Sequence, residues 1–139
     1  MTPPLTDFSP LALMRAIESN VEGFFRGFCC LPTAEVLDTP EMLRVCTTVP
    51  DFIVNGVIRS CLPEADLDVR ITETLEYFRS RRLPMMWLTV PSTQPFDLGT
   101  HLEAHGLQLA GSVPGMAADL DTEKARVARI GSLPPLLRG

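Results

Sequence analysis

Apolar side chains recur at helical spacing in two long parts of the chain, each bounded by residues that start or stop helices. The first begins at Ser9-Pro10, where Ser can cap the helix and Pro suits the first helical position, and it ends before Pro32. Its apolar face comprises Leu11, Met14, Ile17, Val21, Phe24, Phe25 and Phe28. The second begins at Pro63–Asp66 and ends before Pro84, and its stripe comprises Leu67, Ile71, Leu75 and Phe78.

Shorter apolar segments between turn residues predict strands. They are Ala34–Leu37, Leu43–Val49, Phe52–Ser60, Met85–Val90, Leu107–Ser112 and Gly115–Leu120. The first two form a hairpin across Asp38–Glu41, the last two form a final strand pair, and Asn55-Gly56 marks a turn or a bulge. Met85–Val90 is apolar throughout, as in a central strand buried on both faces. A short helix is expected at Leu98–His105, with Gly106 just after its end.

This order of elements predicts an α/β fold with a mixed, mostly antiparallel sheet flanked by helices. We expect one domain over residues 1–120. Residues 121–139 become polar and then Pro-rich, which is typical of a linker or a disordered tail.

Composition and charge narrow the class of partner. The 139 residues carry a formal net charge of -5 and a pI of about 4.9, so phosphate backbones and anionic membranes should repel the chain. No apolar run approaches the roughly 20 residues that span a bilayer, and the first residues do not resemble a signal peptide. We therefore expect a cytoplasmic protein with no nucleic-acid or membrane partner, and with its 4 cysteines reduced.

Patterns that would indicate a complete catalytic site or metal site are missing from the sequence. His101 and His105 have the spacing of two ligands on one helix face, but Leu102 stands where the zinc-protease pattern needs Glu. Neither a phosphate-binding loop nor a nucleophile elbow occurs, and the acidic residues of 64–68 suit a helix start. We expect no metal, and we assign no catalytic residue.

In the second half of the chain, a long helix, a central strand, a short helix ending in Gly and a hairpin with a Met near its end follow in close order, at Ile71–Arg82, Met85–Val90, Leu98–Leu107 and Ala110–Leu120. This succession resembles the C-terminal half of a GNAT (Gcn5-related N-acetyltransferase) domain, in which the central strand is splayed. The resemblance implies a GNAT-like (acyl-CoA N-acyltransferase) fold, acetyl-CoA as cofactor and an amine as acetyl acceptor.

Two departures from the family concern the chemistry. The family's pyrophosphate-binding loop, Arg/Gln-x-x-Gly-x-Gly/Ala, falls on Leu62–Leu67, where there is no glycine, Pro63 lacks a donor, and Glu64 and Asp66 are negative. The tyrosine acid that many members carry is replaced by Leu102. The chain therefore resembles the degenerate N-terminal half of a tandem GNAT protein, a lobe whose partner would be a catalytic GNAT domain, encoded after Gly139, or a second copy in a homo-oligomer.

The resemblance also suggests where ligands would lie. Phe52–Ile58 would face the cleft, and Asn55 would be its best substrate contact, unless this asparagine only forms the turn or bulge. A self-sufficient acetyltransferase would need a V-shaped opening with free backbone donors between Ile58 and Leu88, and Leu88 to Val90 would hold the pantetheine amides. A supporting lobe would instead show an open sheet edge or an exposed apolar patch. A regulatory module for a small ligand would show a closed pocket with inward polar groups.

Overall fold

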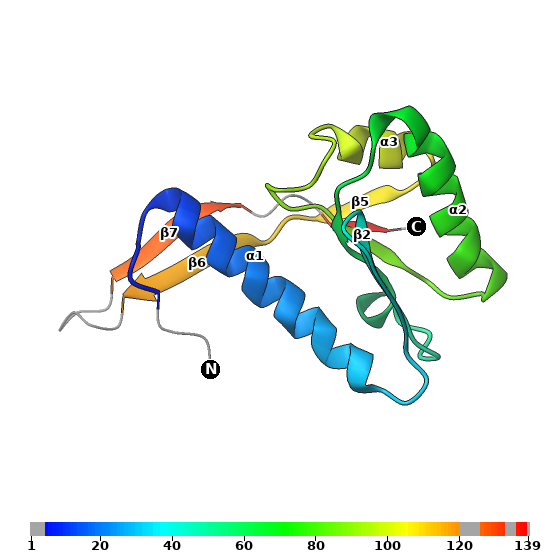
Figure 1. Cartoon of the computed structure of the whole chain (residues 1–139), viewed down its shortest axis with the longest axis horizontal. Helices are drawn as coiled ribbons and strands as arrows, with labels where there is room; N and C mark the ends of the chain where they lie inside the picture. The colour runs from blue at the N-terminus through cyan, green and yellow to red at the C-terminus, as the bar shows by residue number, and fades with distance from the viewer. Residues whose placement is uncertain (1–4, 120–125, 133–135, 139) are drawn as a thin grey trace.

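The computed structural model describes residues 5–119, 126–132 and 136–138 (Figure 1). Its α-helices are α1 (Pro10–Arg26), α2 (Leu67–Ser80) and α3 (Leu98–Ala104), and its 3-10 helices are Gly27–Cys30, Phe52–Val54 and Glu64–Asp66. Its strands are β1 (Glu35–Asp38), β2 (Met42–Cys46), β3 (Gly56–Ser60), β4 (Met86–Leu88), β5 (Gln108–Gly111), β6 (Pro114–Asp119), β7 (Arg126–Ser132) and β8 (Leu136–Arg138).

The main sheet has six strands in the order β1-β2-β3-β4-β8-β5. Only β3 and β4 run parallel, and every other neighbouring pair in this sheet is antiparallel. The predicted α/β class with a mixed, mostly antiparallel sheet is therefore confirmed. A two-stranded sheet of β6 and β7 projects beside the N-terminal half of α1, away from α2 and α3 (Figure 1).

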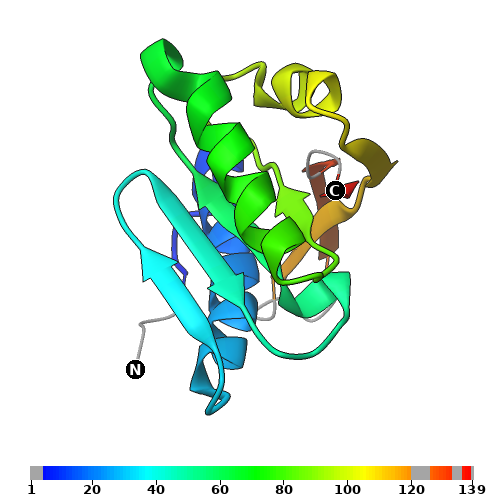
Figure 2. The same ribbon diagram turned by 90° about the vertical axis from the view of Figure 1, so that its right-hand side faces the viewer.

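Helices cover both faces of the sheet, with α2 on one face and α1 on the other (Figure 2). Successive strand residues point to opposite faces, so the sheet builds two apolar clusters. The α2 and α3 side holds Val57, Trp87, Ile71, Phe78 and Leu102, together with Met42, Cys46, Leu62, Leu67, Leu75, Met85, Leu98 and Leu107. The α1 side holds Leu43, Val45, Ile58, Met86, Leu88 and Val90, covered by Val21, Phe25, Phe28, Cys29 and Phe52.

A ring of ion pairs joins α1 to the strands beneath it. Arg26 contacts Glu22 and Asp38 at 2.8 Å each, and Arg59 of β3 contacts the same two carboxylates at 2.8 and 2.9 Å. Hydrogen bonds from Arg26 and then Arg59 hold the pKa of Asp38 below its ordinary value of 3.8. Each acid is shared between two guanidinium groups, so the ring orients α1 through several weak contacts.

The structure corrects two parts of the prediction. The range Phe52–Ser60 does not form one strand, because Asp51 caps the turn at Phe52–Val54 and β3 begins only at Gly56. The segments 107–112 and 115–120 do not pair with each other; β5 pairs with β8, and β6 pairs with β7. Within residues 121–139, where a linker or a disordered tail is expected, the structure describes β7, which pairs with β6, and β8, which lies between β4 and β5.

Candidate functional site

The carboxyl ends of the parallel strands β3 and β4 lie side by side, but the chain itself fills the space between them. The strands pair at Gly56 with Met86 and at Val57 with Trp87. Farther along, the Gln94 N–H donates to the Ser60 carbonyl at 3.1 Å, and the Gln94 carbonyl accepts from the Leu62 N–H at 2.9 Å. The loop after β4 therefore returns and adds a bridge where the two strands have stopped pairing.

A buried hydrogen bond reinforces this closure. The indole Nε1 of Trp87 donates to the Ser60 hydroxyl at 3.1 Å, and both side chains are buried. A buried polar atom without a partner costs about 1–3 kcal/mol, so the pair holds the end of β3 against β4.

The three residues expected to hold the cofactor do come together. Ile58, Leu88 and Val90 are all buried in the apolar cluster beneath α1. The Val90 N–H donates to the Thr93 hydroxyl at 2.8 Å. The N–H groups of Leu62, Val90 and Gln94, three donors around the expected opening, are therefore bonded within the chain.

Asn55, the expected substrate contact, is 1% exposed and bonded on both sides of its amide. Its Oδ1 accepts from the Thr47 N–H at 2.7 Å and from the Thr47 hydroxyl at 3.3 Å. Its Nδ2 donates to the carbonyls of Val49 and Asp51, each at 2.7 Å. Both N–H groups of the amide are thus used to hold the connection from β2 to the 3-10 turn.

The segment aligned with the family's pyrophosphate loop forms one 3-10 turn at Glu64–Asp66, directly before α2. Glu64 and Asp66 are exposed there, while Leu62 on one side and Leu67 on the other are buried. Leu102, at the position of the family's acid, is fully buried in the core. Leu102 offers no group that could donate a proton, and Glu64 and Asp66 place two acidic side chains where a pyrophosphate would approach.

Tyr77 is part of a polar cluster where α2 meets β1 and β2. Its hydroxyl donates to the Glu35 carboxylate, and its ring centroid lies 3.6 Å from the Arg44 guanidinium and 3.7 Å from that of Arg81. Burial, and then the hydrogen bond to Glu35, raises the pKa of Tyr77 above its ordinary value of 10.0. A cavity of about 330 Å³ beside it is lined by Glu35, Arg81 and Cys46, among others.

The histidines bind carboxylates rather than facing each other. His101 Nε2 lies 3.2 Å from Asp97, and His105 Nε2 lies 2.9 Å from Asp68. Within the part of the chain that the structure describes, no group of three His, Cys, Asp or Glu side chains could hold a metal ion. The described cysteines are all free thiols.

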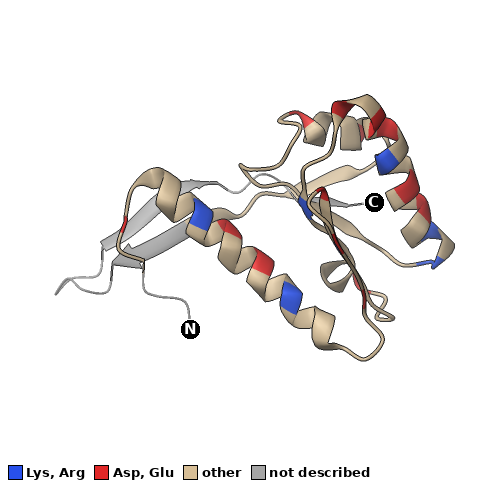
Figure 3. Cartoon of the chain, in the orientation of Figure 1, with Lys and Arg blue, Asp and Glu red and all other residues tan. Residues whose placement is uncertain are grey.

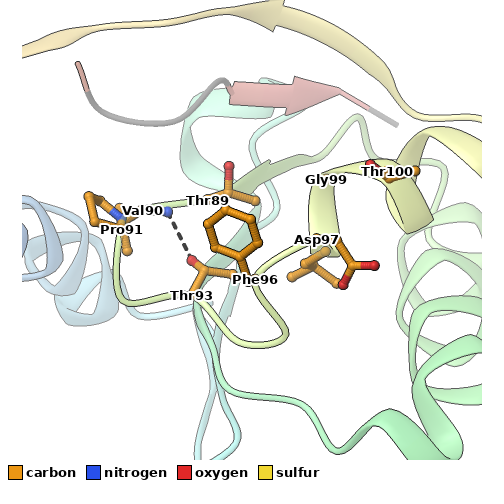
Figure 4. A pocket seen from close by; sticks show the side chains of 9 residues that line it. Thr89, Val90, Pro91, Thr93, Phe96, Asp97, Gly99 and Thr100 are labelled. Carbon is orange, nitrogen blue, oxygen red and sulfur yellow. Dashed lines mark hydrogen bonds between the residues drawn. The ribbon is translucent and has the colours of Figure 1, made fainter. Parts of the chain in front are cut away.

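A cavity of about 360 Å³ lies beyond the carboxyl end of β4, beside the start of α3 (Figure 4). Its lining residues come from the returning loop and the first turn of α3: Thr89, Val90, Pro91, Thr93, Phe96, Asp97, Leu98, Gly99 and Thr100. Of these, the sequence pointed only to Val90. The available signal was the position of the loop, because loops at the carboxyl ends of parallel strands often carry ligand sites.

Comparisons with protein-family models, with curated proteins and with solved structures give no match for this chain. None of the described helices is both long enough and apolar enough to cross a membrane.

Proposed function

We propose that this chain is a GNAT-like lobe that is not itself catalytic and that supports acetyl-CoA-dependent acetyl transfer to an amine by a partner GNAT domain or a second copy. The support for a GNAT-like arrangement is the order of elements around the parallel pair. The long helix α2 follows β3, the central strand β4 follows α2, and the short helix α3 follows β4. This is the succession on which the resemblance rests.

The observation that carries the non-catalytic role is the position of Gln94. Its N–H donates to the Ser60 carbonyl and its carbonyl accepts from the Leu62 N–H, at the place where an amide of a bound cofactor would have to form hydrogen bonds. Exposed Glu64 and Asp66 add negative charge at the start of α2, where a pyrophosphate would approach. The hydrogen bonds that Gln94 makes within the chain, and the repulsion between these carboxylates and a pyrophosphate, both oppose binding of acetyl-CoA to this chain.

A self-sufficient acetyltransferase would have to open this closure. Displacing Gln94 breaks two backbone hydrogen bonds, worth about 0.5–1.5 kcal/mol each, before any ligand contact forms. The binding-competent form would then be a minor species, and apparent affinity would fall by its small fraction.

The edge strand β5 fits the supporting role. It is the last strand of the sheet order, and its four residues are all exposed. An open edge of this kind can pair with a strand of another domain. The catalytic domain or the second copy would add there or pack on the exposed apolar side chains nearby, such as Leu109.

Calorimetric titration with acetyl-CoA tests the proposal. The expected result is no saturable heat at millimolar acetyl-CoA, while the fluorescence of buried Trp87 shows that the protein stays folded. Saturable binding at micromolar concentration would refute the proposal and favour the self-sufficient enzyme. Release of free CoA thiol in the presence of primary amines would refute it in a second way.

A further inference from the structure

The cavity beyond β4 has a position and a size that suit a small ligand. It lies outside the carboxyl end of a strand in the parallel pair, where open α/β sheets commonly bind ligands. Its volume of about 360 Å³ falls in the range of small-molecule sites, which begins near roughly 300 Å³. The proposed supporting role does not use it.

The loop that forms the cavity is held in place by bonds that need no ligand. The Thr93 hydroxyl accepts from the Val90 N–H, and the Thr93 N–H donates to the Val90 carbonyl at 2.9 Å. The Ser92 N–H donates to the Glu18 carboxylate of α1 at 3.1 Å. Gln94 is fixed by its bridge to the end of β3. Because the wall is already ordered, ligand binding does not have to pay the conformational entropy of ordering this loop.

The aromatic side chain of Phe96 is exposed to solvent. It is 95% exposed although it lines the cavity, and Figure 4 shows its ring between the Val90 end of the loop and Asp97. The apolar side chains of Val90, Pro91 and Leu98 complete this part of the lining. An exposed ring beside apolar walls offers a face for an apolar group or for an organic cation.

The charge of the cavity selects between these ligands. Neither Lys nor Arg occurs in the loop between β4 and α3 or among the lining residues, as Figure 3 shows. Asp97 has a side chain that is 61% exposed, and its Oδ2 lies 3.2 Å from His101. Among the described residues, its Oδ1 has no hydrogen-bond partner. Figure 4 shows the Asp97 carboxylate turned away from the Phe96 ring, so it favours a cation and disfavours an anion through its charge, while the ring face supplies the contact.

We propose that this cavity binds a small organic cation, a primary or quaternary ammonium compound with a compact apolar body. The ammonium group lies against the face of Phe96, on the same side of the molecule as the charge of Asp97, and the body rests on Val90 and Pro91. The inference rests on the cavity alone and does not depend on acetyl-CoA binding elsewhere or on a catalytic partner.

An NMR titration of the ¹⁵N-labelled chain with phenethylammonium, 2-phenylethanol and phenylacetate tests the charge preference. These probes share an apolar body and differ in charge. The expected result is saturable shifts centred on residues 89–100 with the ammonium probe, at least about 5-fold tighter than with the neutral alcohol. Equal binding of alcohol and ammonium, tighter binding of the carboxylate, or no saturable shift in this region at tens of millimolar would overturn the proposal.

Variants locate the contacts. Phe96→Ala and Asp97→Asn should each weaken the ammonium probe by roughly 3- to 30-fold, with less effect of Asp97→Asn on the alcohol. Matched controls are Phe24→Ala, a 63% exposed ring on α1, and Asp68→Asn, the carboxylate beside His105. Both controls should bind like the parent chain. Weaker binding of the ammonium probe by the control variants, or unchanged binding by both cavity variants, would contradict the assignment. These titrations contain no acetyl-CoA, so a separate finding that the chain binds acetyl-CoA would refute the proposed function without deciding the outcome of this test.

Discussion

Gly56 lies so close to the backbone of β4 that a single methyl group should disrupt the parallel pair. A Cβ added at Gly56 would lie 2.0 Å from the Met86 carbonyl oxygen and 2.9 Å from its carbon. The usual separation of carbon and oxygen is about 3.3 Å, so Gly56→Ala must move one strand by roughly 1 Å. The obstructing atom is backbone, so no side-chain rotation relieves the clash.

The expected loss follows from two terms. Forcing an extra carbon into a packed interior costs about 1–3 kcal/mol. The shift also strains the bond from the Met86 N–H to the Asn55 carbonyl, now 3.0 Å, whose loss adds about 1 kcal/mol. Gly56→Ala should therefore lower the free energy of unfolding by about 2–5 kcal/mol, a large share of the roughly 5–15 kcal/mol typical of a domain.

Urea denaturation followed by the fluorescence of Trp87 measures this change, because Trp87 is the single tryptophan and is fully buried in β4. The matched control is Gly99→Ala in α3, where an added Cβ meets no atom within 4 Å. Helix propensity should leave that variant unchanged or more stable by up to about 1 kcal/mol. If Gly56→Ala unfolds within about 1 kcal/mol of the parent with the same denaturant slope, the reasoning about this close approach is refuted.

Further predictions concern hydrogen bonds and titrating groups. Asn55→Ala should lower the free energy of unfolding by about 2–4 kcal/mol in the same assay, since it leaves buried backbone groups unpaired; a loss under about 1 kcal/mol would show that water replaces the amide. The raised pKa of Tyr77 means that stability is fully present below pH about 10 and falls as pH rises beyond it. Tyr77→Phe should flatten that fall above pH 10, and parallel curves would contradict the assigned cause. The lowered pKa of Asp38 means that stability is present above about pH 4 and is lost as pH falls below it, so Asp38→Asn should flatten the acid limb of a urea-midpoint series, and an unchanged limb would exclude the ring as its source.

The sequence predicted the elements better than their pairing. The stripe that ends at Phe78 and the glycine at 106 define α2 and α3 through local periodicity and termination. The partner of β5 could not be predicted in this way, because β8 comes more than twenty residues later and sheet pairing depends on which edge remains free. Asn55-Gly56 was recognised as irregular, but the close approach of Gly56 to Met86 depends on a contact distant in sequence.

The candidate site was predicted less well for the same reason. Ile58, Leu88 and Val90 were expected near one another, and they share a cluster. The return of Gln94 to the end of β3 leaves no local pattern, since any residue can donate and accept through its backbone. The exposure of Phe96 also has no signal in the sequence, because one aromatic residue in a loop is as compatible with burial as with solvent.

The closed strand ends and the open cavity are consequences of one loop. To reach Gln94's position beside Ser60, the chain turns sharply at Thr93 and then runs outward to the start of α3, which places Phe96 and Asp97 beyond the sheet. The bridge that removes the backbone donors from a ligand therefore also forms the wall of the cavity. Opening the strand ends for a cofactor would dismantle that wall, so the two sites should exclude each other. A ligand in the cavity should accordingly stabilise the closed loop, and slower amide hydrogen exchange at Gln94 on addition of the ammonium probe would measure that coupling.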